Sequence, residues 1–251
     1  MSEQLVFNTI GNAGMSFTDL TNENIVKMYT YTTQQKDAEP ISYKNFQAKI
    51  NDNCGVTESN VRMYSPFFYS LGLANDYSTD FYINQYFSDI GKAYAKSLIL
   101  CKDLENDDIA YRKAKEISKN ILSLSLINKR KSSSKDYYFD FLKLCLTYGY
   151  TNLCEFNLML YHKEVLKELN YIEIIENPIF KIRSGEYEFV FLQDRKTKDG
   201  QQVREKFPDN TFNYTRNLLT ECGLIRIENN NYYIQESQIR FVDAIVKGEL
   251  S

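Results

Sequence analysis

Two segments of the chain share one pattern of hydrophobic and polar positions. Residues 60–83 and 211–234 align without a gap, so that Gly72 falls on Gly223 and apolar positions coincide on both sides of it. Each segment predicts a helix with one apolar face, a glycine that ends the helix, and two short strands around a polar loop. This order of elements is the second half of a winged helix, and we therefore expect one such unit around each segment.

Helical periodicity dominates the chain between the two segments. Apolar residues recur three and four positions apart in residues 107–129, 137–150 and 151–170, which predicts three helices. Residues 171–193 favour strands instead. We therefore expect a mainly α (α+β) fold in which two winged-helix units flank a central helical segment. The expected divisions are 1–100 for the first unit, 101–170 for the central segment and 171–251 for the second unit.

Composition narrows the class of protein. The 251 residues are 43% apolar and carry a net charge of only −3, so that bulk charge indicates no nucleic-acid binder, although a local basic patch would still serve. The five cysteines form no C-x-x-C pair, and we expect free thiols in a reducing compartment. The start of the sequence lacks the features of a signal peptide, and no run of 18 apolar residues occurs. We expect a cytoplasmic protein without a membrane partner.

Several catalytic classes are excluded by single residue types. The chain has one histidine, His162, which rules out a His–His metal site, an HNH nuclease and an H-E-x-x-H protease. We expect His162 to be a helix-surface residue. Neither a G-x-x-x-x-G-K-[ST] loop nor a G-x-G-x-x-G turn occurs, so we expect no nucleotide and no cofactor in this chain.

The polar faces of the two repeated helices carry chemistry suited to reading bases. Burial of Phe212, Leu219 and Cys222 would turn the opposite face of the second helix to solvent. Arg forms paired hydrogen bonds with guanine, and Asn forms them with adenine. The side chains expected to face duplex DNA are Asn213, Arg216, Asn217 and Thr220 in the second helix and Asn60, Arg62 and Ser65 in the first.

Two basic clusters would supply contacts to phosphate. Residues 112–135 hold eight Lys or Arg, including Lys129, Arg130 and Lys131. Residues 196–206 form a weaker cluster that contains Lys196 and Lys198. Such runs also occur as ordinary solvated faces, and that alternative stays open beside phosphate binding.

Three stretches resemble a family of enzymes. "LGLANDYSTDFYINQYFSDIGKAYAKS" is similar to the recognition region of FokI-type type IIS restriction endonucleases. "YYFDFLKLCLTYGYTNLCEF" resembles the central helical segment of the related AlwI and MlyI group, and "NTFNYTRNLLTECGLIRIENNNYYIQ" resembles its second recognition unit. The resemblance covers most of residues 45–240. It implies that tandem winged helices recognise a short asymmetric site in duplex DNA.

The cleavage part of that family has no clear counterpart. In those enzymes a nuclease domain of the PD-(D/E)-x-K type follows the recognition region, whereas this sequence ends at Ser251. Asp194 and Lys196, with Glu176 upstream, resemble such a site, in which carboxylates hold Mg²⁺. The roughly 40 residues around them are too few for a nuclease domain. We expect the chain not to cut DNA alone, and Mg²⁺ to be needed only by a partner nuclease.

The leading hypothesis is the recognition subunit or region of a type II restriction or nicking endonuclease. It would bind double-stranded DNA, and a separate nuclease subunit or domain would cut. Three alternatives remain. The first alternative is a tandem winged-helix replication initiator or regulator. The second is an Mg²⁺-dependent nuclease that uses Asp194 and Lys196, and the third is a helical adaptor whose winged helices bind protein.

Overall fold

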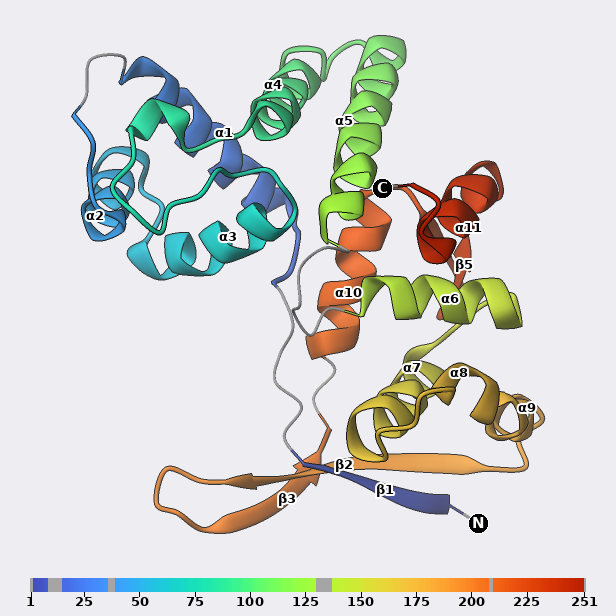
Figure 1. Ribbon diagram of the computed structural model, residues 1–251. Coiled ribbons are helices and arrows are strands. Elements are labelled where there is room, and N and C mark those ends of the chain that lie inside the picture. Colours follow the sequence, from blue (N-terminus) through green and yellow to red (C-terminus); the bar gives the residue numbers. More distant parts are fainter. Residues whose placement is uncertain (1, 9–14, 36–38, 130–136, 208–209, 251) are drawn as a thin grey trace. The chain divides into compact units, whose positions relative to one another are not determined.

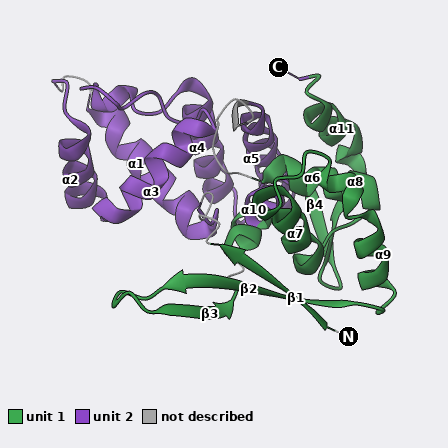
Figure 2. Cartoon of the chain, turned by 60° about the horizontal axis from the view of Figure 1, so that its bottom comes forward, with its two compact units in different colours: residues 1–14, 135–216, 225–249 green, residues 15–134, 217–224, 250–251 purple. Residues whose placement is uncertain are grey.

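A computed structural model describes the chain except for residues 1, 9–14, 36–38, 130–136, 208–209 and 251. The fold is mainly helical with two small sheets, as the periodicity predicted (Figure 1). Contacts divide the chain into two compact units (Figure 2). Unit 1 consists of residues 1–14, 135–216 and 225–249, and unit 2 consists of residues 15–134, 217–224 and 250–251. This grouping differs from the expected boundaries, because residues 101–170 do not form a unit of their own.

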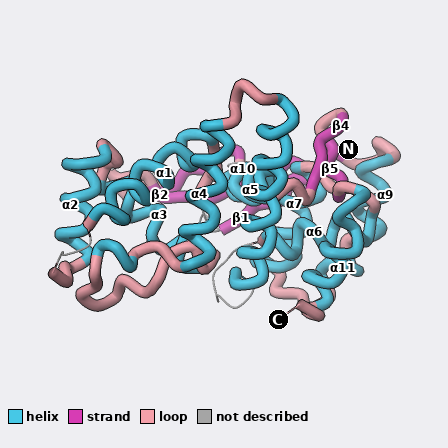
Figure 3. The backbone as a smooth tube through the Cα atoms, turned by 90° about the horizontal axis from the view of Figure 1, so that it is seen from above, coloured by secondary structure: helices cyan, strands magenta, loops and turns pink. Residues whose placement is uncertain are grey.

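The described strands, drawn in magenta in Figure 3, all belong to unit 1. Unit 2 is built from α1 (Asp19–Gln34), α2 (Tyr43–Cys54), α3 (Glu58–Ser70), α4 (Asp89–Asp103) and α5 (Asp108–Lys129). The helices of unit 1 are α6 (Tyr138–Tyr148), α7 (Leu153–Leu160), α8 (Tyr171–Ile174), α9 (Glu176–Arg183) and α11 (Ile239–Lys247). Its strands are β1 (Ser2–Asn8), β2 (Glu188–Lys196), β3 (Gln202–Lys206), β4 (Ile225–Glu228) and β5 (Asn231–Ile234). Helix α10 (Asn210–Glu221) contributes residues to both units.

One arrangement in unit 2, here called module A, comprises α1, α2, α3 and residues 71–87. Just before α2, Ile41 and Phe81 exchange two backbone hydrogen bonds of 3.0 and 3.1 Å. Helix α3 ends at a left-handed Gly72, after which the N–H of Leu73 donates to the carbonyl of Phe68. Glycine is favoured there because a side chain would be strained at φ 71°.

The second arrangement, module B, comprises α6, α7, α10, β4 and β5, and it repeats these bonds. Thr151 precedes α7 and exchanges two backbone hydrogen bonds of 3.0 and 2.8 Å with Tyr232. Gly223 ends α10 at φ 68°, and the N–H of Leu224 donates to the carbonyl of Leu219. In the ungapped alignment Tyr232 falls on Phe81, and Leu224 falls on Leu73. The repeat therefore extends from sequence to backbone hydrogen bonding.

The segments after the two glycines differ. In module B, β4 and β5 form an antiparallel hairpin whose turn residues Asn229 and Asn230 have positive φ. In module A the two strands expected in residues 73–83 are absent, and only isolated bridges such as Ala74↔Phe87 occur. The prediction was wrong there because the Asn75 side chain and a short 3-10 turn take up backbone groups that a hairpin ladder would need.

The modules also differ between their second and third helices. A turn of three residues, 55–57, joins α2 to α3. In module B the connection from α7 to α10 runs through residues 161–209, here called the insertion. It begins with a π-helical turn (Tyr161–Val165) and contains α8, α9, β2 and β3. Strand β1 pairs parallel with β2, and β3 pairs antiparallel with it (Figure 1). Phe7 of β1 is fully buried and contacts Tyr161 and Phe207.

Residues 171–183 are helical, which corrects the expectation of strands. Ile172, Ile175 and Ile179 are buried at spacings of three and four, which is the period of a helix. The β-branched content of the segment misled the prediction, because burial on one helical face outweighs intrinsic preference. Of the described helices, none has the length and apolarity required to cross a membrane.

Candidate nucleic-acid interface

Helix α3 buries the face that its sequence predicts. Thr57 caps it by accepting a hydrogen bond from the N–H of Asn60, and Val61 and Phe68 are fully buried. Arg62 is exposed and Asn60 is half-buried, in line with the expected outward face. Ser65 is different: it is fully buried and shares a 2.8 Å hydrogen bond with the Tyr86 hydroxyl. The expectation that Ser65 faces outward was wrong, because the apolar stripe of this helix is wide enough to include it.

Two exposed apolar side chains lie on the same helix as Arg62. Met63 is 53% exposed and Tyr69 is 52% exposed, and Tyr69 contacts Tyr77 edge to face. A face with one guanidinium between apolar groups suits contacts to base edges and sugars as well as to protein.

Phe212 and Leu219 of helix α10 and Cys222 directly after it are buried, as expected. On the opposite side Thr220 is exposed, whereas Asn213, Arg216 and Asn217 are half-buried and already hydrogen-bonded. The Arg216 Nε donates to Asn213 Oδ1 at 2.8 Å, and its Nη1 donates to the Tyr232 hydroxyl at 3.0 Å. The Asn217 amide donates to Ser16 Oγ at 2.8 Å. These contacts hold the side chains in set orientations.

The contacts of Arg216 still leave donors for a ligand. A guanidinium has five N–H groups in a fixed plane, and the two bonds to Asn213 and Tyr232 use two of them. Tyr232 is buried against Phe212 and Phe141 and bonded through its backbone to Thr151, so the hydroxyl that orients Arg216 is itself fixed. Such preorganisation lowers the entropic cost of a bidentate contact.

The basic cluster at residues 112–135 lies partly on α5. Arg112, Lys113 and Lys115 are exposed, and Lys119 packs its methylenes against Gly223. The side chain of Lys129 and the whole of Arg130 and Lys131 lie outside the described residues. Exposed cations on one helix are suited to phosphate, with the solvated-face alternative still open.

The second basic cluster lies at the end of the β2–β3 hairpin. Lys196 and Lys198 are exposed there. Two cations beside them are paired across the strands: Arg204 with Asp194 at 2.8 Å and Arg195 with Glu205 at 3.0 Å.

The proposed nuclease residues do not form a common cluster. Asp194 is bound by both Nε and Nη2 of Arg204, whose hydrogen bond lowers the pKa of the carboxyl. Glu176 begins α9, on a different element of the insertion. Across the described ranges, no three His, Cys, Asp or Glu side chains gather as metal ligands do.

Two polar features were not evident from the sequence. Glu155, at the start of α7, is completely buried and accepts hydrogen bonds of 2.7 and 3.1 Å from Arg183. Arg183 also donates to the carbonyls of Tyr148 and Tyr150. Burial lowers the pKa of Arg183, but the hydrogen bonds and charge of Glu155 raise it above its usual value. Two partners 28 residues apart in sequence leave no local signal.

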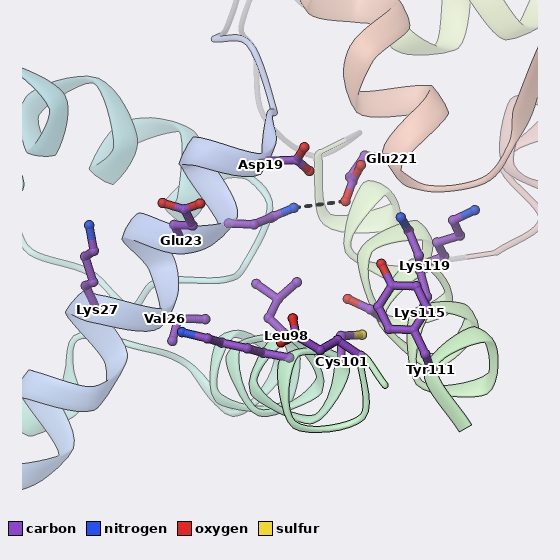
Figure 4. A pocket seen from close by; sticks show the side chains of 14 residues that line it. Asp19, Glu23, Val26, Lys27, Leu98, Cys101, Tyr111, Lys115, Lys119 and Glu221 are labelled. Atoms are coloured by element: carbon purple, nitrogen blue, oxygen red, sulfur yellow. Dashed lines mark hydrogen bonds between the residues drawn. The ribbon is translucent and has the colours of Figure 1, made fainter. Parts of the chain in front are cut away.

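The second feature is a groove of about 760 Å³ in unit 2. Figure 4 shows acidic side chains from α1 and lysines from α5 around it. Asn22 donates to Glu221 at 2.9 Å and accepts from the Tyr94 hydroxyl at 2.9 Å. Because acids and lysines alternate around this groove, it offers no surface of a single sign.

His162 lies in the π-helical turn and is half-buried. Its Nδ1 lies 2.5 Å from Glu168 Oε2, so the ring is tied to a carboxylate within its own segment. We expected His162 to be an ordinary helix-surface residue. The expectation was incomplete, because the π-helical turn places the His162 ring beside Glu168.

Comparison of the chain with known protein families, with curated proteins and with solved structures gives no match.

Proposed function

We propose that modules A and B are winged helices that together bind duplex DNA in a sequence-specific manner. The observation that carries the proposal is the repeated bonding pattern. In each module a residue just before the second helix pairs with the chain that follows the third helix, and a left-handed glycine ends that third helix. In a winged helix the third helix commonly reads the major groove and the following hairpin flanks it.

An arginine on each of the two third helices supports DNA as the partner. Arg62 is exposed on α3, and Arg216 is preorganised on α10 with donors to spare. The two arginines occupy different positions of the repeat, because Arg62 falls on Asn213 and Arg216 falls on the buried Ser65 in the ungapped alignment. Two such helices would read two stretches of one site, each adding discrimination of about 1–3 kcal/mol per good base contact.

A finer proposal is that the chain recognises DNA for a type II restriction or nicking endonuclease whose cleavage is performed by another chain or domain. Its support is the sequence resemblance to type IIS enzymes described above. Mg²⁺ would then belong to the partner nuclease. Under this proposal the recognised site is short and asymmetric, because the two modules differ in sequence on their reading faces.

Selection of bound duplexes from a random pool tests the proposal. We expect one short asymmetric consensus. A palindrome or a direct repeat would favour a replication initiator or regulator instead, and no enrichment at all, with the protein folded, would leave protein binding as the function of both modules.

The salt dependence of binding tests the role of the basic cluster. Replacing Lys129, Arg130 and Lys131 together by Ala should weaken binding to all sequences and reduce the slope of log K against log salt by up to about three contacts. The matched control replaces Arg240 and Lys247, which are exposed on α11 outside both third helices. An unchanged slope in the triple variant would remove that cluster from the interface.

A further inference from the structure

A cavity of about 690 Å³ lies within unit 1, where the insertion meets module B. Its wall is formed by the start of α7, the first half of β2, residues 206–207 and the turn between β4 and β5. Strand β3 pairs with β2 from Leu192 onward and the N–H of Phe207 still donates to the carbonyl of Phe191, so the edge of β2 at residues 188–190 has no strand partner on that side. The cavity lies along this open edge.

The wall is apolar with a small number of polar groups. Phe189, Phe191 and Leu153 supply aromatic and aliphatic surface, and Asn152 and Asn231 supply amides at the start of α7 and in the hairpin. The charged groups that line it are Glu188 and Lys206, one of each sign. An apolar cavity with a few polar groups is the usual form of a small-molecule site.

Asn157 is the group that indicates a ligand. It is only 4% exposed and lines the cavity, and no hydrogen bond joins its side chain to another residue that the structure describes. Its amide atoms are not among the fully enclosed, unpaired polar atoms of the described residues, so water in the cavity reaches them. A carboxamide that is almost enclosed and lines a cavity is therefore available to a molecule inside it.

The chemistry of the wall selects the ligand class. A nucleobase presents flat aromatic faces to rings such as Phe189 and Phe191, and its edge offers paired donors and acceptors that a carboxamide matches. Lys206 would meet a phosphate attached to that base. The Cys154 thiol, whose pKa is raised to about 11 by burial, adds a neutral polarisable surface.

We propose that this cavity binds a single nucleobase, with Asn157 bonding its edge. The base has two sources with the same chemistry: a free nucleoside, or an unpaired base of bound DNA. The second source rests on the proposed function, in which the β4–β5 turn flanks the duplex and carries Asn230 and Asn231 beside the cavity. The sequence lacked phosphate-binding glycine loops, but recognition through the base requires none.

The experiment has two arms, both with the full chain. In the first, adenosine, guanosine, cytidine and thymidine are each titrated by calorimetry. In the second, duplexes with a single 2-aminopurine opposite an abasic site are titrated, and fluorescence reports whether the base leaves the stack and enters the protein. We expect saturable binding in at least one arm.

Three variants connect the signal to the cavity. Asn157→Leu keeps the volume and removes the amide, and it should weaken binding at least tenfold. Gln47→Leu is the matched control, because Gln47 occupies the equivalent buried position of α2 and is not part of this cavity. Phe189→Leu, at a half-buried site, gives a second reading if Asn157→Leu fails to fold.

The outcomes separate the two proposals. Nucleoside binding that Asn157→Leu weakens supports the cavity even if the protein binds no DNA. A 2-aminopurine signal that is lost in the variant, without nucleoside binding, assigns the base to DNA. Binding of neither probe overturns the nucleobase site, while the duplex selection described above still decides the proposed function. Equal loss in Gln47→Leu would likewise overturn it.

Discussion

Modules A and B share their backbone bonding and differ in the connection between the second and third helices. In module A this connection is a turn of three residues, whereas in module B it is the insertion with its own sheet. The pairs Ile41–Phe81 and Thr151–Tyr232 keep the same hydrogen bonds in spite of this difference. The bridge and the glycine cap therefore define the module, and the second connection tolerates an insertion with its own sheet.

The insertion is anchored by charged and polar side chains rather than by apolar burial alone. Arg183 of α9 reaches Glu155 of α7, and Lys163 binds Asp140 of α6 at 2.5 Å. The hydroxyl of Tyr171 donates to the same carboxylate. Module A needs no comparable ion pairs, because only a three-residue turn joins its second and third helices.

The largest expected effect breaks module B alone. Arg183→Ala leaves Glu155 fully buried without its cation, and removal of one partner of such a pair costs about 3–5 kcal/mol. Urea unfolding followed with hydrogen exchange should place this loss in unit 1. The control is Arg195→Ala, whose pair with Glu205 is largely exposed and is worth about 1 kcal/mol or less. Equal losses in the two variants would contradict the anchoring role of Arg183.

A smaller effect should break module A alone. A Cβ at Gly91 of α4 would lie 1.8 Å from the carbonyl oxygen of Leu73, directly after the capping Gly72. Gly91→Ala should therefore destabilise unit 2 by about 1–3 kcal/mol, although the same change at an exposed helix position would gain about 1 kcal/mol. Lys92→Ala on the same helix is the control. Faster hydrogen exchange confined to unit 2 is the expected result, and a stabilised Gly91→Ala variant would contradict it.

If α3 and α10 both contact bases, substitutions on the two helices should change the base preference at different positions of the DNA site. Arg216→Ala should relax preference at one or two base pairs, at a cost of about 1–3 kcal/mol on the preferred sequence, with non-specific affinity nearly unchanged. Tyr232→Phe removes only the hydroxyl that orients Arg216 and should produce a weaker form of the same change, about 1 kcal/mol. Arg62→Ala should relax preference at different positions. Quantitative binding to single-substituted duplexes measures all three, and a uniform loss would make Arg216 a phosphate contact instead.

The smallest expected effect concerns the insertion as a nuclease. Incubation of the isolated chain with Mg²⁺ or Mn²⁺ and its selected duplex should leave the DNA intact, because Arg204 occupies the Asp194 carboxylate. Asp194→Ala should change nothing on a sequencing gel. Nicking that this substitution abolishes would show that the insertion is catalytic.

The sequence predicted what depends on local periodicity. The buried stripe of α3 and the two capping glycines follow from spacing alone, and they were confirmed. The pairing of β1 with β2 was missed, since Leu5 and Phe7 alternate clearly but their partners lie far along the chain. The same holds for the candidate site. The periodicity turned Arg216 outward, whereas it is half-buried, and its bond to Tyr232 depends on the path of β5, which no spacing reveals.

Strand β1 has a consequence for how the chain is made. The register joins Ser2 to Glu188, so the partner strand of β1 is synthesised only after most of unit 2. Until then Leu5 and Phe7 carry apolar surface with no sheet to cover it. Contacts so distant in sequence form slowly and late, because the entropy of closing a long loop is lost before the contacts stabilise the fold. Residues 15–134 of unit 2 can therefore begin to pack before β1 finds its partner, although residues 217–224 join unit 2 only later. The uncovered strand is then the point at which a chaperone would act.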